Sequence, residues 1–115
     1  MEIPVTLRFF LTAKSPQAKQ KVWTWITSHL AANAPRLTIP DIESGDGALT
    51  HAGSWADGIF QLLRICQSIG HQWVLTDNID FRFDAWSNQP AIAGVEAINV
   101  IADNPDVTRE DPDVC

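Results

Sequence analysis

Apolar residues occupy every second position from Ile3 to Leu11, and the residues between them are polar apart from Pro4 and Phe10. A period of two is typical of a strand with one buried face. Pro4 lies near the start of this segment, where a strand tolerates a missing N–H donor. The pattern therefore predicts a strand over residues 3–11, with Phe10 as an aromatic residue on its otherwise polar face.

Two other segments repeat apolar residues at three- and four-residue spacing, as the buried face of a helix does. The first begins at Ser15, an N-cap residue followed by a first-turn proline, and is predicted to end before Pro35. The second begins at Ser54, which resembles a capping box with Asp57 in place of the usual glutamate. This second helix is predicted to end at Gly70 in a left-handed conformation.

The remaining segments favour strands. Residues 36–53 contain two short apolar runs around a glycine-rich turn, which indicates either a hairpin at a sheet edge or a long loop. Residues 71–76 are strand-like, and residues 79–86 alternate in the clearest strand pattern of the chain. Residues 95–101 suit a strand or a short helix, and their β-branched side chains favour the strand.

This order of elements predicts an α+β fold. Both helices would lie on one face of a mainly antiparallel sheet, in a two-layer sandwich. The leading topology is ferredoxin-like, βαββαβ with extra C-terminal strands. Residues 1–102 would form a single domain, and residues 103–115, which are rich in proline and acidic side chains, a loosely held acidic tail.

The composition is that of a globular protein, with 115 residues of which 45% are hydrophobic and 19% charged. The formal net charge of -6 disfavours a nucleic-acid partner, because phosphates would be repelled. No apolar run is long enough to span a membrane, and the N-terminus has no signal-peptide pattern. Cys66 and Cys115 are interpreted as free thiols. These features predict a soluble cytoplasmic protein with no nucleic-acid or membrane partner.

The sequence contains no catalytic, metal or cofactor motif. The three histidines, His29, His51 and His71, lack the spacing that presets two ligands on one face of a helix or strand. Cys66 lies on the apolar face of a predicted helix, and no serine occurs in a nucleophile-elbow motif. No catalytic residue, metal ligand or cofactor is therefore assigned, and catalysis is the less favoured function.

One face of the predicted strand 79–86 combines charge with an indole. Its alternate positions are Asp80, Arg82, Asp84 and Trp86. An indole beside carboxylates attracts organic cations, because the face of the ring is negative. These four residues are therefore a hypothetical binding site for a small organic cation. The alternative is an ordinary solvated strand face with a cross-strand charge ladder.

Three aromatic residues, Phe10, Trp23 and Trp86, fall on faces that are otherwise polar. Gathered in space, they would mark an interface. The favoured function is therefore a small binding or adaptor protein that self-associates as a homodimer. The first alternative is an acidic inhibitor or immunity-type protein that binds a basic enzyme. The second alternative is a small enzyme of unknown class.

Overall fold

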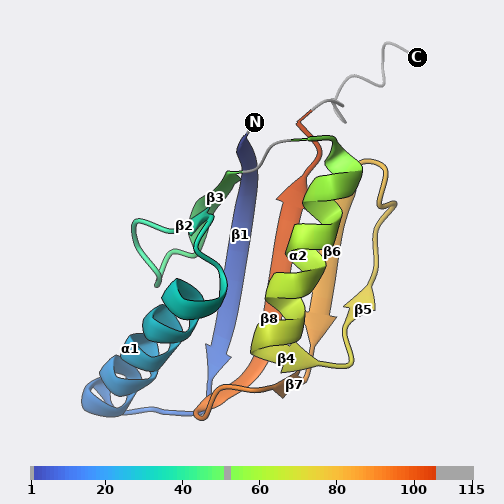
Figure 1. Ribbon diagram of the computed structural model, residues 1–115. Helices are drawn as coiled ribbons and strands as arrows, with labels where there is room; N and C mark the ends of the chain where they lie inside the picture. The colour runs from blue at the N-terminus through green and yellow to red at the C-terminus, as the bar shows by residue number, and fades with distance from the viewer. Residues whose placement is uncertain (1, 51–52, 106–115) are drawn as a thin grey trace.

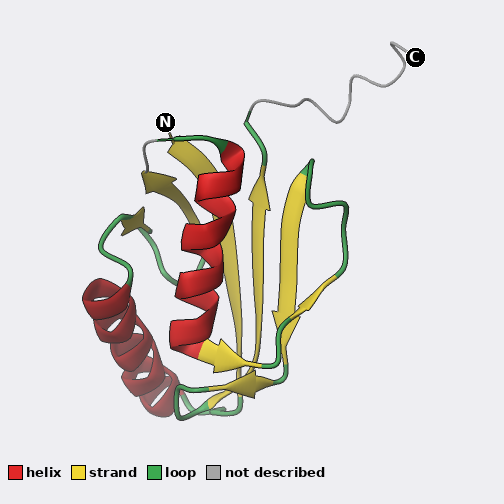
Figure 2. Cartoon of the chain, turned by 45° about the vertical axis from the view of Figure 1, so that its right-hand side comes forward, coloured by secondary structure: helices red, strands yellow, loops and turns green. Residues whose placement is uncertain are grey.

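The computed structural model describes residues 2–50 and 53–105, which form one layer of helices and one of strands (Figure 1). In chain order the elements are β1 (Glu2–Leu11), α1 (Pro16–Asn33), β2 (Leu37–Thr38), β3 (Asp46–Thr50), α2 (Trp55–Ile69), β4 (Gly70–His71), β5 (Val74–Leu75), β6 (Arg82–Ser87), β7 (Gln89–Pro90) and β8 (Val95–Asp103). Six strands form one sheet in the order β2-β3-β1-β8-β6-β5, and β4 pairs with β7. Every described pair is antiparallel. Both helices cover the same face of the large sheet (Figure 2), so the predicted α+β class is confirmed.

The ferredoxin-like detail is not confirmed. In a βαββαβ unit the second helix leads directly to the last strand of the sheet. Here α2 is followed by β4, β5, β6 and β7, and only then does the chain reach β8, the neighbour of β1. The extra strands are therefore inserted before the last strand of the sheet and are not added after it.

The core lies between the large sheet and the two helices. Burial alternates along β1 as the sequence pattern predicts, with every second side chain turned toward the helices. The largest fully buried hydrophobic side chains come from both helices and from four strands: Ile3, Leu7, Ile26, Leu49, Leu62, Ile69, Phe83, Ile98 and Val100. One contiguous cluster of this kind is what stabilises a domain of this size.

Both predicted helices are confirmed, with their N-caps. The Ser15 hydroxyl accepts a hydrogen bond from an N–H group in the first turn of α1. At α2 the side chains of Ser54 and Asp57 each accept a hydrogen bond from the other residue's backbone N–H, as in a capping box. The predicted left-handed ending at Gly70 is wrong. The backbone there is extended, with φ of -171°, because α2 runs directly into β4.

The segment between the helices is a hairpin, not a long loop. β2 pairs with β3, and β3 continues the sheet onto β1. The turn before β3 needs glycine at position 45, where φ is +78°. A Cβ atom on Gly45 would come within 2.0 Å of the carbonyl oxygen of Leu7. The hairpin therefore passes β1 at a distance that only glycine allows.

The prediction of a strand over residues 79–86 is wrong at its beginning. β6 begins at Arg82, because Asn78 starts a turn. The carbonyl oxygen of Asn78 accepts hydrogen bonds from the N–H groups of Phe81 and Arg82 at 2.9 and 3.0 Å, and its side chain accepts one from Asp80 at 3.0 Å. The predicted strand before this turn is also divided, into β4 and β5.

The predicted strand near the C-terminus is confirmed as β8, which extends to Asp103. Asn104 follows it and is buried; its N–H donates to the carbonyl oxygen of Phe81 and its Nδ2 to that of Asp80, both at 2.9 Å. Contacts with the domain therefore continue past the predicted boundary after residue 102. The rest of the predicted tail, residues 106–115, lies outside the described residues.

We expect Asn104→Ala to lower the free energy of unfolding by about 1–2 kcal/mol, because it removes the hydrogen bond to the carbonyl oxygen of Asp80 from a buried position. Urea denaturation measures this change. Gln17→Ala, on the exposed side of α1, serves as the surface control. If the Asn104→Ala protein were as stable as the control, the hydrogen bond of this side chain would not stabilise the end of β8.

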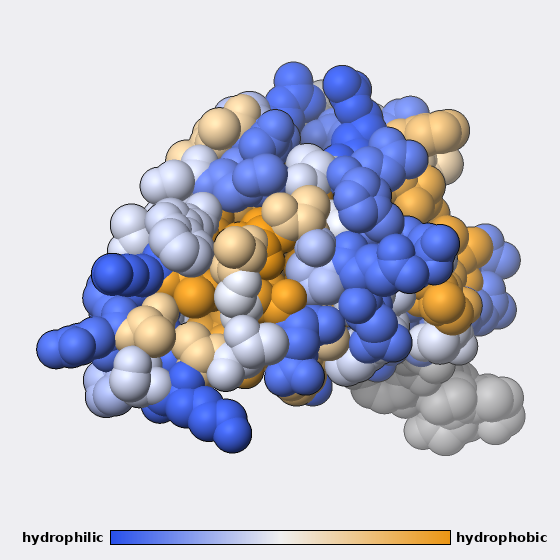
Figure 3. Space-filling view, turned by 90° about the horizontal axis from the view of Figure 1, so that it is seen from below, coloured by the Kyte–Doolittle hydropathy of each residue, from blue (hydrophilic) through white to orange (hydrophobic). Residues whose placement is uncertain are grey.

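β4 and β7 lie at the end of the sandwich where β1 stops (Figure 1). Ile92 and Val95, close to this end, are 7% and 8% exposed. Seen from this end, hydrophobic residues gather near the centre of the surface, with hydrophilic residues around them (Figure 3). Hydrophobic residues therefore reach the surface at this end of the sandwich.

Candidate functional site

The face of the large sheet opposite the helices is not covered by any described element (Figure 2). Directly paired residues of antiparallel strands point to the same side of a sheet, so the register shows which side chains share this face. Two neighbouring rows across β1, β8 and β6 are Arg8-Asn99-Trp86 and Thr6-Ile101-Asp84. Together with Phe10 and Ala97, these residues form the centre of what is termed the open face.

Phe10 and Trp86 meet on the open face across β8. Their ring centroids are 5.3 Å apart, and the ring planes are inclined by 52°. Phe10 is paired with Ala97 of β8, whose small side chain leaves room for rings from β1 and β6 to meet above it. Ala97 is only 6% exposed beneath them, whereas Phe10 is 42% exposed. The structure therefore brings together two of the three predicted interface aromatics.

Trp23 lies on the other side of the sheet. Its ring packs edge-on against Phe9, with centroids 6.2 Å apart and an interplanar angle of 88°. Phe9 is buried on the helix side of β1. Trp23 is therefore not gathered in space with Phe10 and Trp86, because this indole lies at the margin of the core.

Two charged residues of the predicted ligand site, Arg82 and Asp84, already have side-chain partners within the domain. Arg82 donates from Nε to Oδ1 of Asp103 at 2.7 Å, and this hydrogen bond raises the pKa of the guanidinium above its ordinary value. Asp84 accepts a hydrogen bond on Oδ1 from Nδ2 of Asn99 at 2.9 Å. Asp80 lies in the turn before β6 and is not on the strand face with the others.

Trp86 is half-buried and has neighbours on two sides. Its indole Nε1 donates to Oδ1 of Asn88 at 3.0 Å, and the ring of Phe10 lies against it. A cation site of the expected kind combines the face of an indole with a carboxylate. Asp84 supplies that carboxylate two residues before Trp86 on the same face of β6. Binding of a small organic cation by these residues stays a prediction.

Arg8 carries no signal in the sequence that marks it as functional. The register places it in the same row as Trp86, on the other side of β8, because both residues pair with Asn99. Its side chain is exposed and forms no ion pair with a described residue. An unpaired arginine close to an aromatic pair is a typical interface composition.

The side chains of His29 and Cys66 have structural surroundings. His29 donates from Nε2 to the carbonyl oxygen of Ser68 at 2.5 Å, which joins α1 to α2. Burial raises the pKa of the Cys66 thiol to about 12, so this group is protonated at neutral pH. Within residues 2–50 and 53–105, no three His, Cys, Asp or Glu side chains gather in positions that suit a metal ion.

The described chain is a two-layer α+β domain, and described elements cover only one side of its large sheet. Comparisons of the chain with known protein families, with curated proteins and with solved structures found no match. In the described part of the chain, no helix is long and apolar enough to cross a membrane.

Proposed function

We propose that this protein is a binding protein that forms homodimers through its open face. The observation that carries the proposal is the contact between Phe10 and Trp86 on a sheet face that no described element covers. Aromatic side chains near the centre of a patch are the usual anchors of protein interfaces. Packing this face against the same face of a second copy would bury both rings and convert two layers into four.

The edges of the sheet are less suited to association than its face. The edge strands β2 and β5 are two residues long each. Short edge strands offer few free N–H and C=O groups for the addition of a partner strand. The open face, in contrast, presents side chains from the long strands β1, β6 and β8.

The register of β1, β8 and β6 supports the packing of two open faces against each other. Arg8 and Trp86 flank Asn99 in one row. Consider a two-fold axis that is parallel to β8 and lies midway between two facing sheets. This axis exchanges the positions of Arg8 and Trp86, so the guanidinium of each protomer lies over the indole of its partner. The contact would therefore occur twice in the dimer. A guanidinium over an indole gains cation–π energy, and the gain increases when water is excluded. The cation predicted for this face is, in this proposal, Arg8 of a second copy.

A second copy also suits the mixed charge of the open face. Asp84 lies two residues before Trp86 on the same side of β6, so a partner's arginine meets an indole and a carboxylate together. A basic enzyme that bound this face would instead meet Arg8 beside the aromatic pair, and the positive charges would repel each other. The alternative of an inhibitor of a basic enzyme therefore has less support than self-association.

We expect Arg8→Glu to raise the dissociation constant of the dimer at least ~10-fold, because a carboxylate over the negative face of an indole replaces a cation. Sedimentation velocity measures the dimer fraction. Lys21→Glu makes the same change of charge at an exposed position on α1, away from the open face. Equal dimer fractions in the two variants would contradict the proposed interface.

A further inference from the structure

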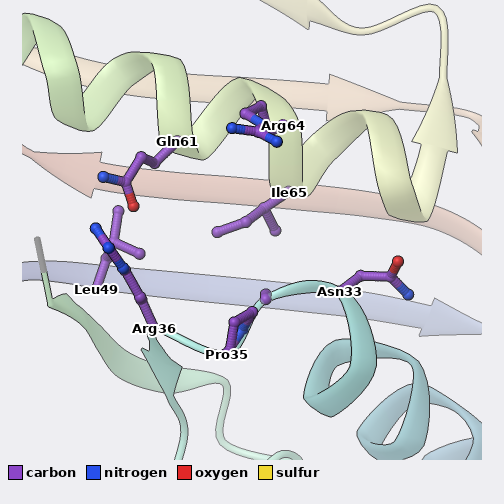
Figure 4. A pocket seen from close by; sticks show the side chains of 8 residues that line it. Asn33, Pro35, Arg36, Leu49, Gln61, Arg64 and Ile65 are labelled. Carbon is purple, nitrogen blue, oxygen red and sulfur yellow. The ribbon is translucent and has the colours of Figure 1, made fainter.

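We propose that a pocket on the helix side of the sheet binds a small organic anion through Arg36 and Arg64. The pocket lies where the end of α1, the hairpin of β2 and β3, and α2 meet (Figure 4). Its volume is ≈ 350 Å³, which falls in the range of small-molecule sites. Because the helices cover the opposite side of the sheet from the open face, this site is independent of the proposed dimer.

Arg36 lies on one wall of the pocket, where backbone hydrogen bonds hold the chain. Its carbonyl oxygen accepts a hydrogen bond from the N–H of Thr50 at 2.9 Å, and the N–H of Leu37 donates to the carbonyl oxygen of Ala34 at 3.1 Å. From this position the side chain extends across the pocket toward Gln61 (Figure 4). The guanidinium of Arg36 therefore extends from a short segment between α1 and β2 whose backbone is held by hydrogen bonds.

The opposite wall is α2, which contributes Gln61 and Arg64. Residues three apart on a helix lie on the same side, so both side chains reach the rim of the pocket. Leu49 of β3 and Ile65 of α2, 1% and 6% exposed, form an apolar floor beneath them. Polar groups that converge above an apolar surface are the usual composition of a small-ligand site.

The pocket concentrates positive charge in an acidic protein. Arg36 and Arg64 are two of only 8 Lys and Arg residues, in a chain with 14 Asp and Glu. Among the described residues, no carboxylate lines the pocket and neither arginine has an ion-pair partner. Two like charges at one pocket repel each other, and the attraction of a bound anion to both of them offsets this repulsion.

The class of ligand follows from these groups. Guanidinium groups bind carboxylates and phosphates with paired N–H···O hydrogen bonds, which a single lysine cannot supply. The amide of Gln61 adds one further donor or acceptor. An apolar part of the ligand would lie on Leu49 and Ile65. The site therefore suits a compact organic anion with one carboxylate or phosphate group on an apolar body.

Nuclear magnetic resonance titration of the full chain with benzoate and with phenyl phosphate tests this proposal. Either anion is expected to shift the Nε–Hε signals of Arg36 and Arg64 together with the methyl signals of Leu49 and Ile65. Neutral benzamide, which has the same ring, is expected to shift none of them. The anion with the lower dissociation constant identifies the group as carboxylate or phosphate.

Arg36→Gln and Arg64→Gln each remove one exposed guanidinium, and each is expected to raise the dissociation constant ~10-fold. Lys21→Gln removes the same charge from the first half of α1 and is expected to leave binding unchanged. The proposal is overturned if neither anion shifts these signals, if benzamide shifts them equally, or if both arginine variants bind as tightly as the lysine variant.

Discussion

Replacing Phe83 with alanine is expected to lower the free energy of unfolding by about 3–5 kcal/mol. Phe83 is 0% exposed and lies on β6, in the cluster between the sheet and the helices. β6 is hydrogen-bonded to β8 on one side and to β5 on the other, so its backbone cannot move in to fill the space left by the ring. A loss of this size is a large part of the stability of a small domain.

Phe60→Ala is the matched control for this prediction. It makes the same chemical change on α2 at a side chain that is 68% exposed, and we expect it to change stability by no more than about 0.5 kcal/mol. Urea denaturation of both variants, followed by tryptophan fluorescence, gives the two free energies. Equal stability of the Phe83→Ala and Phe60→Ala proteins would contradict the placement of the core.

Removing the side chain of Trp86 is expected to raise the dissociation constant of the dimer ~30-fold or more, the effect of losing an interface anchor worth about 2 kcal/mol. The indole is the group over which Arg8 of the partner lies in the proposed dimer, and it supports the ring of Phe10. Phe10→Ala is expected to weaken the dimer in the same direction. Circular dichroism is expected to show an unchanged fold, because both side chains project from the open face and not into the core.

Trp25→Ala is the matched control for the indole. Trp25 is 49% exposed on α1, which lies on the helix side of the sheet. Its removal is expected to leave the dimer unchanged when both variants are compared by sedimentation velocity. If Trp25→Ala lost as much dimer as Trp86→Ala, the dimer contact would lie on the helices and not on the open face.

Most elements of the fold were predictable because they leave local signals in the sequence. The alternation from Ile3 to Leu11 needs no knowledge of the partners of β1, and the caps at Ser15 and Ser54 fix the helix starts by hydrogen bonds within a few residues. One error occurred where a side chain competes with a regular pattern. The residue is Asn78, since its hydrogen bonds convert the start of an alternating segment into a turn.

The candidate sites were only partly predictable. Phe10 and Trp86 each interrupt the alternation of their own strand, and this local signal identified them. Their contact depends on β8 lying between β1 and β6 with Ala97 beneath the rings, which no local pattern shows. The pocket of Arg36 and Arg64 was not predictable at all, because these residues meet only when α2 packs beside the hairpin.

Sedimentation equilibrium of the unmodified protein over the micromolar range tests the central claim most directly. Association through the open face predicts an average mass that rises with concentration from 12.7 kDa toward twice that value. A mass of 12.7 kDa at every concentration would contradict it.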